Sequence, residues 1–288
     1  MPADRALSED TVLEAFDDLL ARGKLIYGET KPVYVTDRGF DFEFRICQAF
    51  LTKPQLTGPQ SNTEIRKFGP HSDIDFADDK LLLAEFNNGT HILVLNKFCV
   101  SRPQYILLTK DSTRKQLESL GLDEFKSLLE VFGALEGGER GRGTRHWMLY
   151  NCGEEAGSSR RHKHMQVFRY PTSFRVFPDR QPGEVVVPYK HFLRYLDSNR
   201  NPSAEELMSI YEELLEQVGR PGPHNVIFTS SWILVIPRTK ANFDGADGNG
   251  AAMMGMVWVT DEEKIRRWER LGPARVLSQL GVPLPMER

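Results

Sequence analysis

The chain has 288 residues, of which 40% are hydrophobic and 27% charged, an ordinary globular composition and enough for one large domain or two close-packed ones. A formal net charge of −3 argues against a nucleic-acid polymer as the main partner, and no apolar run approaches the length of a membrane span. The three cysteines are odd in number and widely spaced, so neither a disulfide framework nor a structural zinc site is indicated.

The first twenty residues, MPADRALSEDTVLEAFDDLL, are acidic and amphipathic. They lack the basic start and the apolar block of a signal peptide, so we expect an intracellular protein of the cytoplasm, with the nucleus left open as a further location. A helix is predicted over residues 7–24, because Phe16, Leu19 and Leu20 lie on one stripe and Gly23 follows at its end.

Strand patterns follow between residues 40 and 110. The segment FDFEFRICQAFL, residues 40–51, alternates apolar and polar side chains and predicts a half-buried strand. Residues 57–79 are polar and rich in turn formers, which predicts a surface excursion. Residues 89–100 and 104–110 are apolar runs separated by SRP, and they predict two neighbouring strands.

A helix and two further strands are predicted in the middle of the chain. LDEFKSLLEVFGALEGG, residues 122–138, carries an apolar stripe at helical spacing, with Asp123 as the expected N-cap. HWMLYNCG, residues 146–153, and HKHMQVFRY, residues 162–170, are strand-like and are joined by a loop of small and charged residues.

The last third of the chain is predicted to hold a helix, a hairpin, a glycine-rich loop that runs into a strand, and a closing helix. These four elements are expected in that order over residues 201–219, 224–238, 241–260 and 261–281. Ser203 and Glu206 form a capping box at the start of the first helix. Because strands and helices mix along the whole chain without regular βαβ alternation, the predicted fold class is α+β with a mostly antiparallel sheet flanked by helices.

The segment GSSRRHKHMQVF, residues 157–168, carries the strongest chemical signal. In a strand, residues two apart share a face, so His162, His164 and Gln166 are predicted to point one way, and Met165 and Val167 the other way, into the core. The loop before the strand, EEAGSSRR, offers glycine backbone amides, two hydroxyls and two guanidiniums, which together suit a phosphate group.

Such an arrangement fits nucleophilic attack on phosphorus. A neutral imidazole is a good nucleophile near neutral pH, because its unperturbed pKa is about 6.5. It needs one nitrogen free, the other held by a hydrogen bond, and nearby donors that stabilise the phosphoryl oxygens. The His-x-His spacing alone leaves two other interpretations open: a plain structural strand, or two ligands of a metal site with a third from elsewhere.

The segment YNCGEEAGSSRRHKHMQ resembles the signature of the diadenosine tetraphosphate (Ap4A) phosphorylases, also called ATP adenylyltransferases, of the histidine-triad superfamily. Three further segments resemble this family in the same order: FRICQAFLTKP, LVLNKFCVSRPQYILLTKD and HNVIFTSSWILVIPRTK. The start of the strand at Gly255 and Met256 fits as well. The resemblance spans residues 40 to 260 and is to the fungal type with a long chain. It implies a histidine-triad-like sheet, with a catalytic part over residues 1–200 and a part over residues 201–288 that completes the same fold, as one compact domain or two.

The resemblance implies a role for each matching residue. His164 would attack the α-phosphate and form an adenylyl-histidine, which inorganic phosphate would discharge as ADP, so that Ap4A becomes ATP and ADP. His162 would orient His164 or the substrate, and Gln166 would contact a phosphoryl oxygen. The expected substrate and phosphate contacts are Lys53, Asn96, Lys97, Asn151, Ala156, Gly157, Ser158, Ser159, Asn249, Gly250, Ala251, Met256 and Thr260.

The chain departs from the family pattern at several positions. Ala156 stands where serine is usual, Arg160 where glutamine is common and Gln104 where histidine is frequent. Thr260 stands where a lysine is expected, so Arg160 or Lys240 would have to supply the cation at the terminal-phosphate end. These departures leave the nucleophile intact, and they leave open the substrate length and whether phosphate or water is the preferred acceptor.

The expected function is therefore that of a nucleotidyltransferase. Its partners would be diadenosine polyphosphates, ATP, ADP and inorganic phosphate, with no nucleic acid and no membrane, and the monomer and the homodimer both stay open. No cofactor is required by the chemistry and no metal ligand is assigned, although a magnesium ion would suit the polyphosphate as a counter-ion. Two alternatives remain: a dinucleoside polyphosphate hydrolase or related nucleotidyltransferase of the same superfamily, and an inactive nucleotide-binding sensor.

Overall fold

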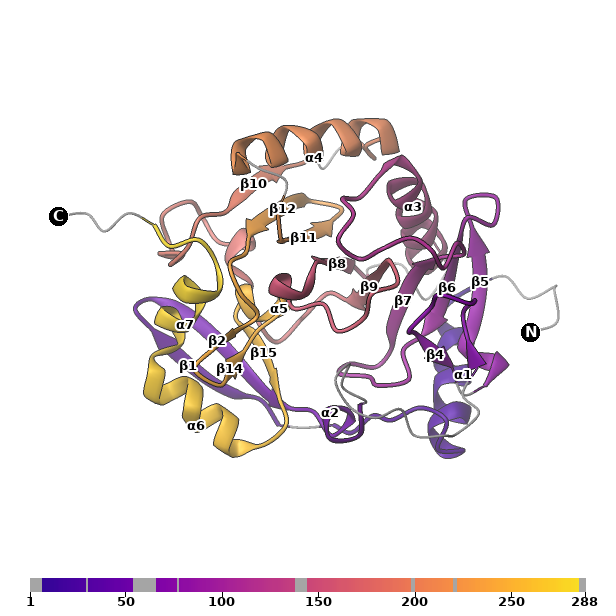
Figure 1. Cartoon of the computed structure of the whole chain (residues 1–288), viewed down its shortest axis with the longest axis horizontal. Coiled ribbons are helices and arrows are strands. Elements are labelled where there is room, and N and C mark those ends of the chain that lie inside the picture. Colours follow the sequence, from indigo (N-terminus) through magenta and orange to yellow (C-terminus); the bar gives the residue numbers. More distant parts are fainter. Residues whose placement is uncertain are drawn as a thin grey trace.

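A computed structural model describes residues 7–29, 31–53, 66–76, 78–137, 144–197, 200–219 and 222–284. Its centre is an antiparallel sheet of eight strands in the order β10-β12-β11-β8-β9-β7-β6-β5 (Figure 1). The strands in that order are Phe192–Tyr195, Trp232–Pro237, His224–Thr229, His146–Cys152, His164–Arg169, Gln104–Thr109, His91–Leu95 and Leu82–Phe86. The predicted α+β fold with a mostly antiparallel sheet is confirmed.

Three long helices cover one face of the large sheet: α1 (Glu9–Ala21), α3 (Leu122–Glu136) and α4 (Ala204–Val218). They bury a continuous apolar cluster, to which β9 contributes Met165 and Val167. Burial of this apolar surface between the helices and the sheet stabilises the fold.

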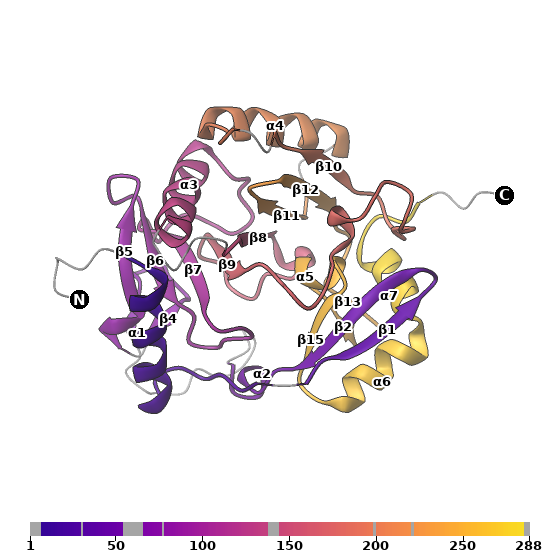
Figure 2. The ribbon, with the colours of Figure 1, turned by 180° about the vertical axis from the view of Figure 1, so that it is seen from behind.

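A smaller sheet packs against the opposite face. It consists of β1 (Val33–Asp37), β2 (Phe40–Ile46) and β15 (Met256–Val259), with β1 antiparallel and β15 parallel to β2 (Figure 2). Two C-terminal helices, α6 (Glu262–Leu271) and α7 (Pro273–Leu280), and the short α5 (Gly250–Met253) pack with this smaller sheet in a second apolar cluster.

The remaining elements are short. They are the helix α2 (Ala49–Thr52), the strand pairs β3 (Arg66–Lys67) with β4 (Asp75–Phe76) and β13 (Asn242–Phe243) with β14 (Ala246–Asp247), and the 3₁₀ turns η1 (Asp79–Leu81), η2 (Glu154–Ala156) and η3 (Phe177–Asp179). In the described part of the chain, no helix is long and apolar enough to cross a lipid bilayer.

Several sequence predictions need correction. The strand predicted over residues 40–51 ends at Ile46 and gives way to α2. The closing helix is two helices, because Gly272 adopts a φ of +79° and Pro273 begins the second one. The N-cap of α3 is Gly121 rather than Asp123, with Glu124 bonding back to its N–H.

Two further predictions hold only in part. At the start of α4, Ser203 accepts from the Glu206 N–H at 3.1 Å, but the carboxylate of Glu206 pairs with Arg200, so half of the capping box forms. The excursion predicted over residues 57–79 lies partly outside the described residues. Its described end forms the β3–β4 pair, and Ser72 within it is buried, not on the surface.

Candidate active site

Strand β9 lies in the middle of the large sheet (Figure 1). It begins at His164 rather than at His162 as predicted, and His162 forms only an isolated bridge with Lys115. The alternation along β9 is as predicted for His164 and Gln166, which line a cavity, and for Met165 and Val167, which lie in the core under the long helices. The β8 ladder pairs with β9 only from Gln166 to Arg169. At His164, the side chain of Gln116 takes the place of the neighbouring strand, accepting from the His164 N–H at 2.7 Å and donating to its carbonyl at 2.9 Å.

The imidazole of His164 is held in one tautomer. Its Nδ1 lies 2.8 Å from the carbonyl oxygen of His162, which can only accept, so Nδ1 carries the proton. In the neutral ring Nε2 then has a free lone pair, and no described residue hydrogen-bonds it. Burial lowers the pKa of His164 to about 4, with the charges of Lys53 and His162 adding to the effect. The ring is 7% exposed and opens onto the cavity.

The imidazole of His162 lies elsewhere. It is 1% exposed and lines neither cavity of the site; its Nδ1 faces the Ser72 hydroxyl at 2.8 Å and its Nε2 faces the Thr109 carbonyl at 2.9 Å. Residue 162 therefore orients His164 through its backbone carbonyl rather than through its ring. Since the two imidazoles do not converge, this pair does not form the metal site that the spacing left open. Among the described residues, no group of three His, Cys, Asp or Glu side chains is placed to hold a metal ion.

Two adjoining cavities make up the site, one of about 400 Å³ and one of about 70 Å³. The smaller cavity reaches His164 and Lys97, and the larger one extends from Gln166 towards β15 and the loop before α5. A volume of about 400 Å³ is within the usual range of small-molecule sites. The residues that line both cavities are Lys53, Asn96, Phe98, Ser159, Arg160 and Gln166.

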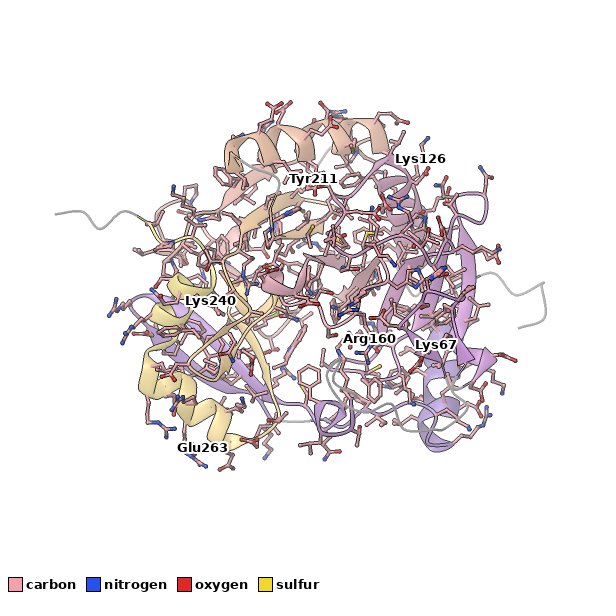
Figure 3. All side chains as sticks on the ribbon, in the orientation of Figure 1. Lys67, Lys126, Arg160, Tyr211, Lys240 and Glu263 are labelled. Carbon is pink, nitrogen blue, oxygen red and sulfur yellow. The ribbon has the colours of Figure 1, made fainter. Side chains whose placement is uncertain are left out.

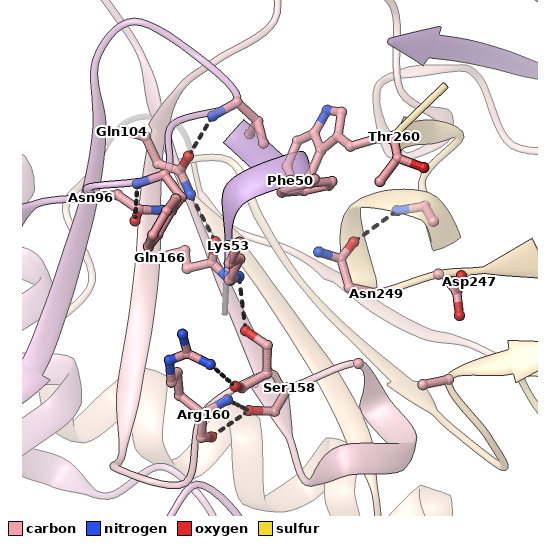
Figure 4. A pocket seen from close by; sticks show the side chains of 18 of the residues that line it. Phe50, Lys53, Asn96, Gln104, Ser158, Arg160, Gln166, Asp247, Asn249 and Thr260 are labelled. Atoms are coloured by element: carbon pink, nitrogen blue, oxygen red, sulfur yellow. Dashed lines mark hydrogen bonds between the residues drawn. The ribbon is translucent and has the colours of Figure 1, made fainter. Parts of the chain in front are cut away.

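Two asparagines direct donor groups into the larger cavity (Figure 4). The Asn96 Oδ1 accepts from the Phe98 N–H at 3.0 Å, and the Asn249 Oδ1 accepts from the N–H groups of Ala251 and Ala252 at 3.0 and 3.3 Å. A backbone N–H can only donate, so each side-chain oxygen is fixed and each NH₂ group is left to face the cavity. Amide donors of this kind suit phosphate oxygens.

The loop before β9 brings hydroxyls and a guanidinium to the same place. Ser159 Oγ accepts from the ammonium of Lys53 at 2.9 Å, and burial, with the nearby charge of Arg160, lowers the pKa of Lys53 to about 8. Gly157 has a φ of +88°, and a Cβ there would come within 2.7 Å of the Asn249 backbone. Only glycine allows this loop to pack so closely on the Asn249 turn.

The cation expected at the position of Thr260 is not replaced by Lys240. Thr260 lines the larger cavity, but Lys240 lies 5.5 Å over the Phe243 ring, well away from Arg160 in the molecule (Figure 3). Arg160 lines both cavities, whereas Lys240 lines neither.

Five residues expected among the substrate contacts line neither cavity. Asn151 is buried and braces the site from behind, because its Oδ1 accepts from Asn225 Nδ2 at 2.8 Å and from the Gly250 N–H at 3.1 Å. The backbone at Gly250 packs closely on the Leu149 side chain, and a Cβ at this position would lie only 2.4 Å from it. The sequence-based expectation of direct contact is therefore not supported by the positions of Asn151, Ala156, Gly250, Ala251 and Met256.

Sequence reasoning missed several residues of the site. Phe50 and Trp258 give the larger cavity an aromatic end, and Asp73 accepts from the N–H groups of Arg161 and His162 at 2.6 and 3.0 Å. The strand predicted up to residue 260 places Trp258 near the glycine-rich loop, but the sequence gives no signal that its ring lines the site. For Asp73 there was none, because its partners are 88 and 89 residues away.

The N-terminal domain of the Ap4A phosphorylases matches residues 5–182, and the C-terminal domain of the ATP adenylyltransferases matches residues 186–283. Diadenosine 5',5'''-P1,P4-tetraphosphate phosphorylase 2 of Saccharomyces cerevisiae is 28% identical over 223 residues, covering 65% of this chain and 68% of that protein. Protein APA1 of the same yeast is 25% identical over 300 residues, covering 91% and 89%.

The fold is also that of a solved relative. The crystal structure of yeast Ap4A phosphorylase Apa2 in complex with Ap4A matches with a TM-score of 0.76 at 21% identity, covering 96% of this chain and 97% of that one. The same protein in complex with AMP matches equally well, covering 97% and 98%.

Proposed function

Because this chain belongs to the Ap4A phosphorylase family, we propose that it cleaves diadenosine tetraphosphate with inorganic phosphate to give ATP and ADP. The observation that carries this proposal is the geometry of His164. A neutral imidazole has its Nδ1 proton held by a carbonyl, and its free Nε2 opens onto a cavity of amide, hydroxyl and cationic donors.

The reaction runs in two displacements. The Nε2 lone pair of His164 attacks the α-phosphorus of one adenosine, the bond from that phosphorus to the bridging oxygen breaks, and ATP leaves with the bonding electrons. An oxygen of inorganic phosphate then attacks the same phosphorus, the phosphorus–nitrogen bond breaks, and ADP leaves with the His164 lone pair restored. No net redox change or additional reactant is needed.

The surroundings of His164 fit the charge that develops at phosphorus. Lys53 and Arg160 bring positive charge and Asn96 brings an amide donor to the cavity of His164, and Asn249 brings a further amide donor to the adjoining larger cavity. The carbonyl of His162 also stabilises the ring, since the Nδ1 proton it accepts carries more charge as Nε2 forms its bond.

The aromatic end of the larger cavity supports binding of one adenosine. Phe50 and Trp258 offer faces on which a purine can stack, and a stacked base contributes about 1–3 kcal/mol by alanine substitution. A divalent cation carried in with the polyphosphate and a cytoplasmic location stay predictions, and monomer and homodimer both stay open.

The test is to incubate the protein with diadenosine tetraphosphate, with and without inorganic phosphate, and to separate the nucleotides by chromatography. We expect equal amounts of ATP and ADP that appear only with phosphate. His164→Gly should reduce turnover by at least about a thousandfold, the scale on which loss of a nucleophile is felt. His191→Ala, which changes a histidine at the far end of the large sheet, should keep the wild-type rate.

Other products would point to another activity. ATP and AMP formed without phosphate would identify a hydrolase of the same superfamily. Nucleotide binding without any product would identify a sensor and would contradict the proposal, as would full turnover in His164→Gly.

A further inference from the structure

We propose that Gln104 is a positioning residue that fixes the amide of Gln166 with its NH₂ group towards the substrate phosphates. The inference rests on the proposed adenylyl transfer at His164. It concerns which end of the Gln166 amide faces the substrate and what fixes that orientation. Gln104 lies on β7, next to β9, and is 2% exposed.

The first link is a backbone group whose polarity cannot change. The Val100 N–H lies 2.8 Å from Gln104 Oε1. A backbone N–H is a donor only, so the oxygen of the Gln104 amide must face it, and the NH₂ group must face the other way. The assignment of oxygen and nitrogen in this side chain therefore follows from the chain itself.

The second link passes this polarity to Gln166. Gln104 Nε2 lies 2.9 Å from Gln166 Oε1. Figure 4 marks this hydrogen bond with a dashed line. An amide nitrogen donates, so Gln166 must present its oxygen to Gln104 and its NH₂ group to the cavity. No described residue accepts a hydrogen bond from Gln166 Nε2, and Gln166 lines both the larger cavity and the smaller one with His164.

The strand geometry explains why an intermediary is needed. Asn96 and Asn249 lie at turns, where nearby backbone N–H groups hold their oxygens directly. Gln166 lies inside β9, where the ladders to β7 and β8 use the backbone groups. Gln104 is its diagonal neighbour, since Gln104 pairs with Phe168 and Gln166 with Ile106. Gln104 therefore hydrogen-bonds both the Val100 N–H and Gln166, so that the Val100 N–H determines how the Gln166 amide is oriented.

The orientation matters because the two ends of an amide act oppositely on a phosphoryl group. With NH₂ towards the substrate, Gln166 stabilises the negative oxygens of the transition state. With the amide reversed, its carbonyl oxygen would repel them. Without Gln104, both orientations would be open to Gln166, and the site would lose a preorganised donor.

Gln104→Glu is the diagnostic variant. When ionised, the carboxylate that this change introduces still accepts from the Val100 N–H but presents an acceptor to Gln166, which must then turn its NH₂ group away from the substrate. When protonated, the same carboxyl has one accepting and one donating oxygen and restores the original polarity. Gln104→His is the conservative variant, because a neutral imidazole also accepts with one nitrogen and donates with the other.

The experiment compares kcat and KM of wild type, Gln104→Glu, Gln104→His and Gln104→Leu between about pH 5 and pH 8.5, a range in which the low pKa of His164 keeps its ring neutral. Gln217→Glu, on the exposed face of α4, is the matched control for a new carboxylate. Thermal melts check the fold of every variant. AMP binding, measured by calorimetry over the same range, reports on the same donor without needing turnover.

We expect Gln104→Glu to lose at least about tenfold in kcat at the alkaline end, with a smaller change in KM, because the lost donor acts on the transition state. The ratio of variant to wild type should rise as pH falls and the new carboxyl protonates. Gln104→Leu should lose activity at every pH. Gln104→His should stay within about threefold of wild type above about pH 7.5, where its imidazole is neutral and keeps the polarity.

Two results would overturn the inference: a Gln104→Glu rate that equals wild type at the alkaline end, or a loss in Gln104→Glu that does not change with pH and is matched by Gln104→His. A failure of the proposed function is recognised separately, because wild type itself would then form no ATP and ADP. In that case the AMP affinities of the same variants still decide the role of Gln104.

Discussion

At the scale of single residues, the site combines an imidazole that resists protonation with an ammonium that gives up its proton easily. Burial lowers the pKa of His164 to about 4 and that of Lys53 to about 8. Protonated His164 has no lone pair for phosphorus, and neutral Lys53 no longer attracts the polyphosphate. We therefore predict that kcat/KM rises as pH increases through about 4, stays level, and falls as pH increases through about 8.

The measurement is the pH dependence of kcat/KM, which reports the ionisations of the free enzyme. Lys53→Arg should remove the alkaline fall, because a guanidinium stays charged. If the acid side of the profile instead gave an apparent pKa of about 6.5, the ordinary pKa of histidine, the ring of His164 would be solvated in the working enzyme.

The sequence could predict the alternation of His164, Met165, Gln166 and Val167, because a strand has a period of two. It could not predict that the His162 ring turns away to Ser72. That contact spans ninety positions and exists only once the turn between β3 and β4, which holds Ser72, lies against His162.

At the scale of elements, helix α3 is joined by a buried ion pair to the residue just before strand β9, within the catalytic segment. Lys163 lies between the two histidines of the motif and points to the opposite face, where its Nζ is 2.8 Å from Glu124 Oε1. Burial alone would raise the pKa of Glu124, but His91 and the charge of Lys163 outweigh it and lower the pKa to about 2. The ionised pair therefore stabilises the fold.

We predict that Glu124→Gln lowers the free energy of unfolding by about 3–5 kcal/mol, because it leaves Lys163 buried without its counter-charge. Chemical denaturation at neutral pH measures this loss. Glu212→Gln, on the exposed face of α4, should change stability by no more than about 0.5 kcal/mol.

The same pair sets a pH dependence of stability. The pKa of Glu124 is about 2 in the folded state and 4.5 as the ordinary value, so its contribution is complete above about pH 5 and is lost as pH falls towards 2. Wild type should lose stability across this window more steeply than Glu124→Gln. Parallel curves for the two proteins would contradict the role given to the pair.

Element boundaries show what local sequence can and cannot decide. Apolar periodicity predicted α1, α4 and the β11–β12 hairpin at nearly their observed positions. It merged α6 and α7 into one helix, because the apolar stripe continues through the break at Gly272 and Pro273. Here the backbone preference of two residues outweighs a periodic pattern.

At the scale of the whole molecule, Arg238 hydrogen-bonds several segments around the site that are far apart in the sequence. Its guanidinium is 4% exposed and donates to the carbonyls of Ala156, Gly248 and Leu280 at 3.2, 2.6 and 3.1 Å. It also donates to Asn225 Oδ1 at 2.6 Å. Within the described residues, no ion pair includes Arg238, so backbone and amide dipoles alone balance its charge, and burial lowers its pKa to about 10.

We predict that Arg238→Met destabilises the protein by about 3–5 kcal/mol and raises KM, since buried carbonyls lose their donors and the loop at Ala156 loosens. Arg238→Lys should recover little, because one ammonium cannot span the same acceptors. Arg266→Met, on the exposed side of α6, serves as the control. Unfolding curves and KM together check this, and an Arg238→Lys protein equal to wild type would refute it.

The most direct test of the account is the stereochemistry at the α-phosphorus. The measurement uses a diadenosine tetraphosphate analogue with a chiral thiophosphate at that position and determines the configuration of the ADP analogue formed with inorganic phosphate. Each in-line displacement inverts phosphorus. Attack by His164 followed by attack of phosphate predicts retention of configuration, whereas inversion would mean that phosphate displaces ATP directly and that His164 is not the nucleophile.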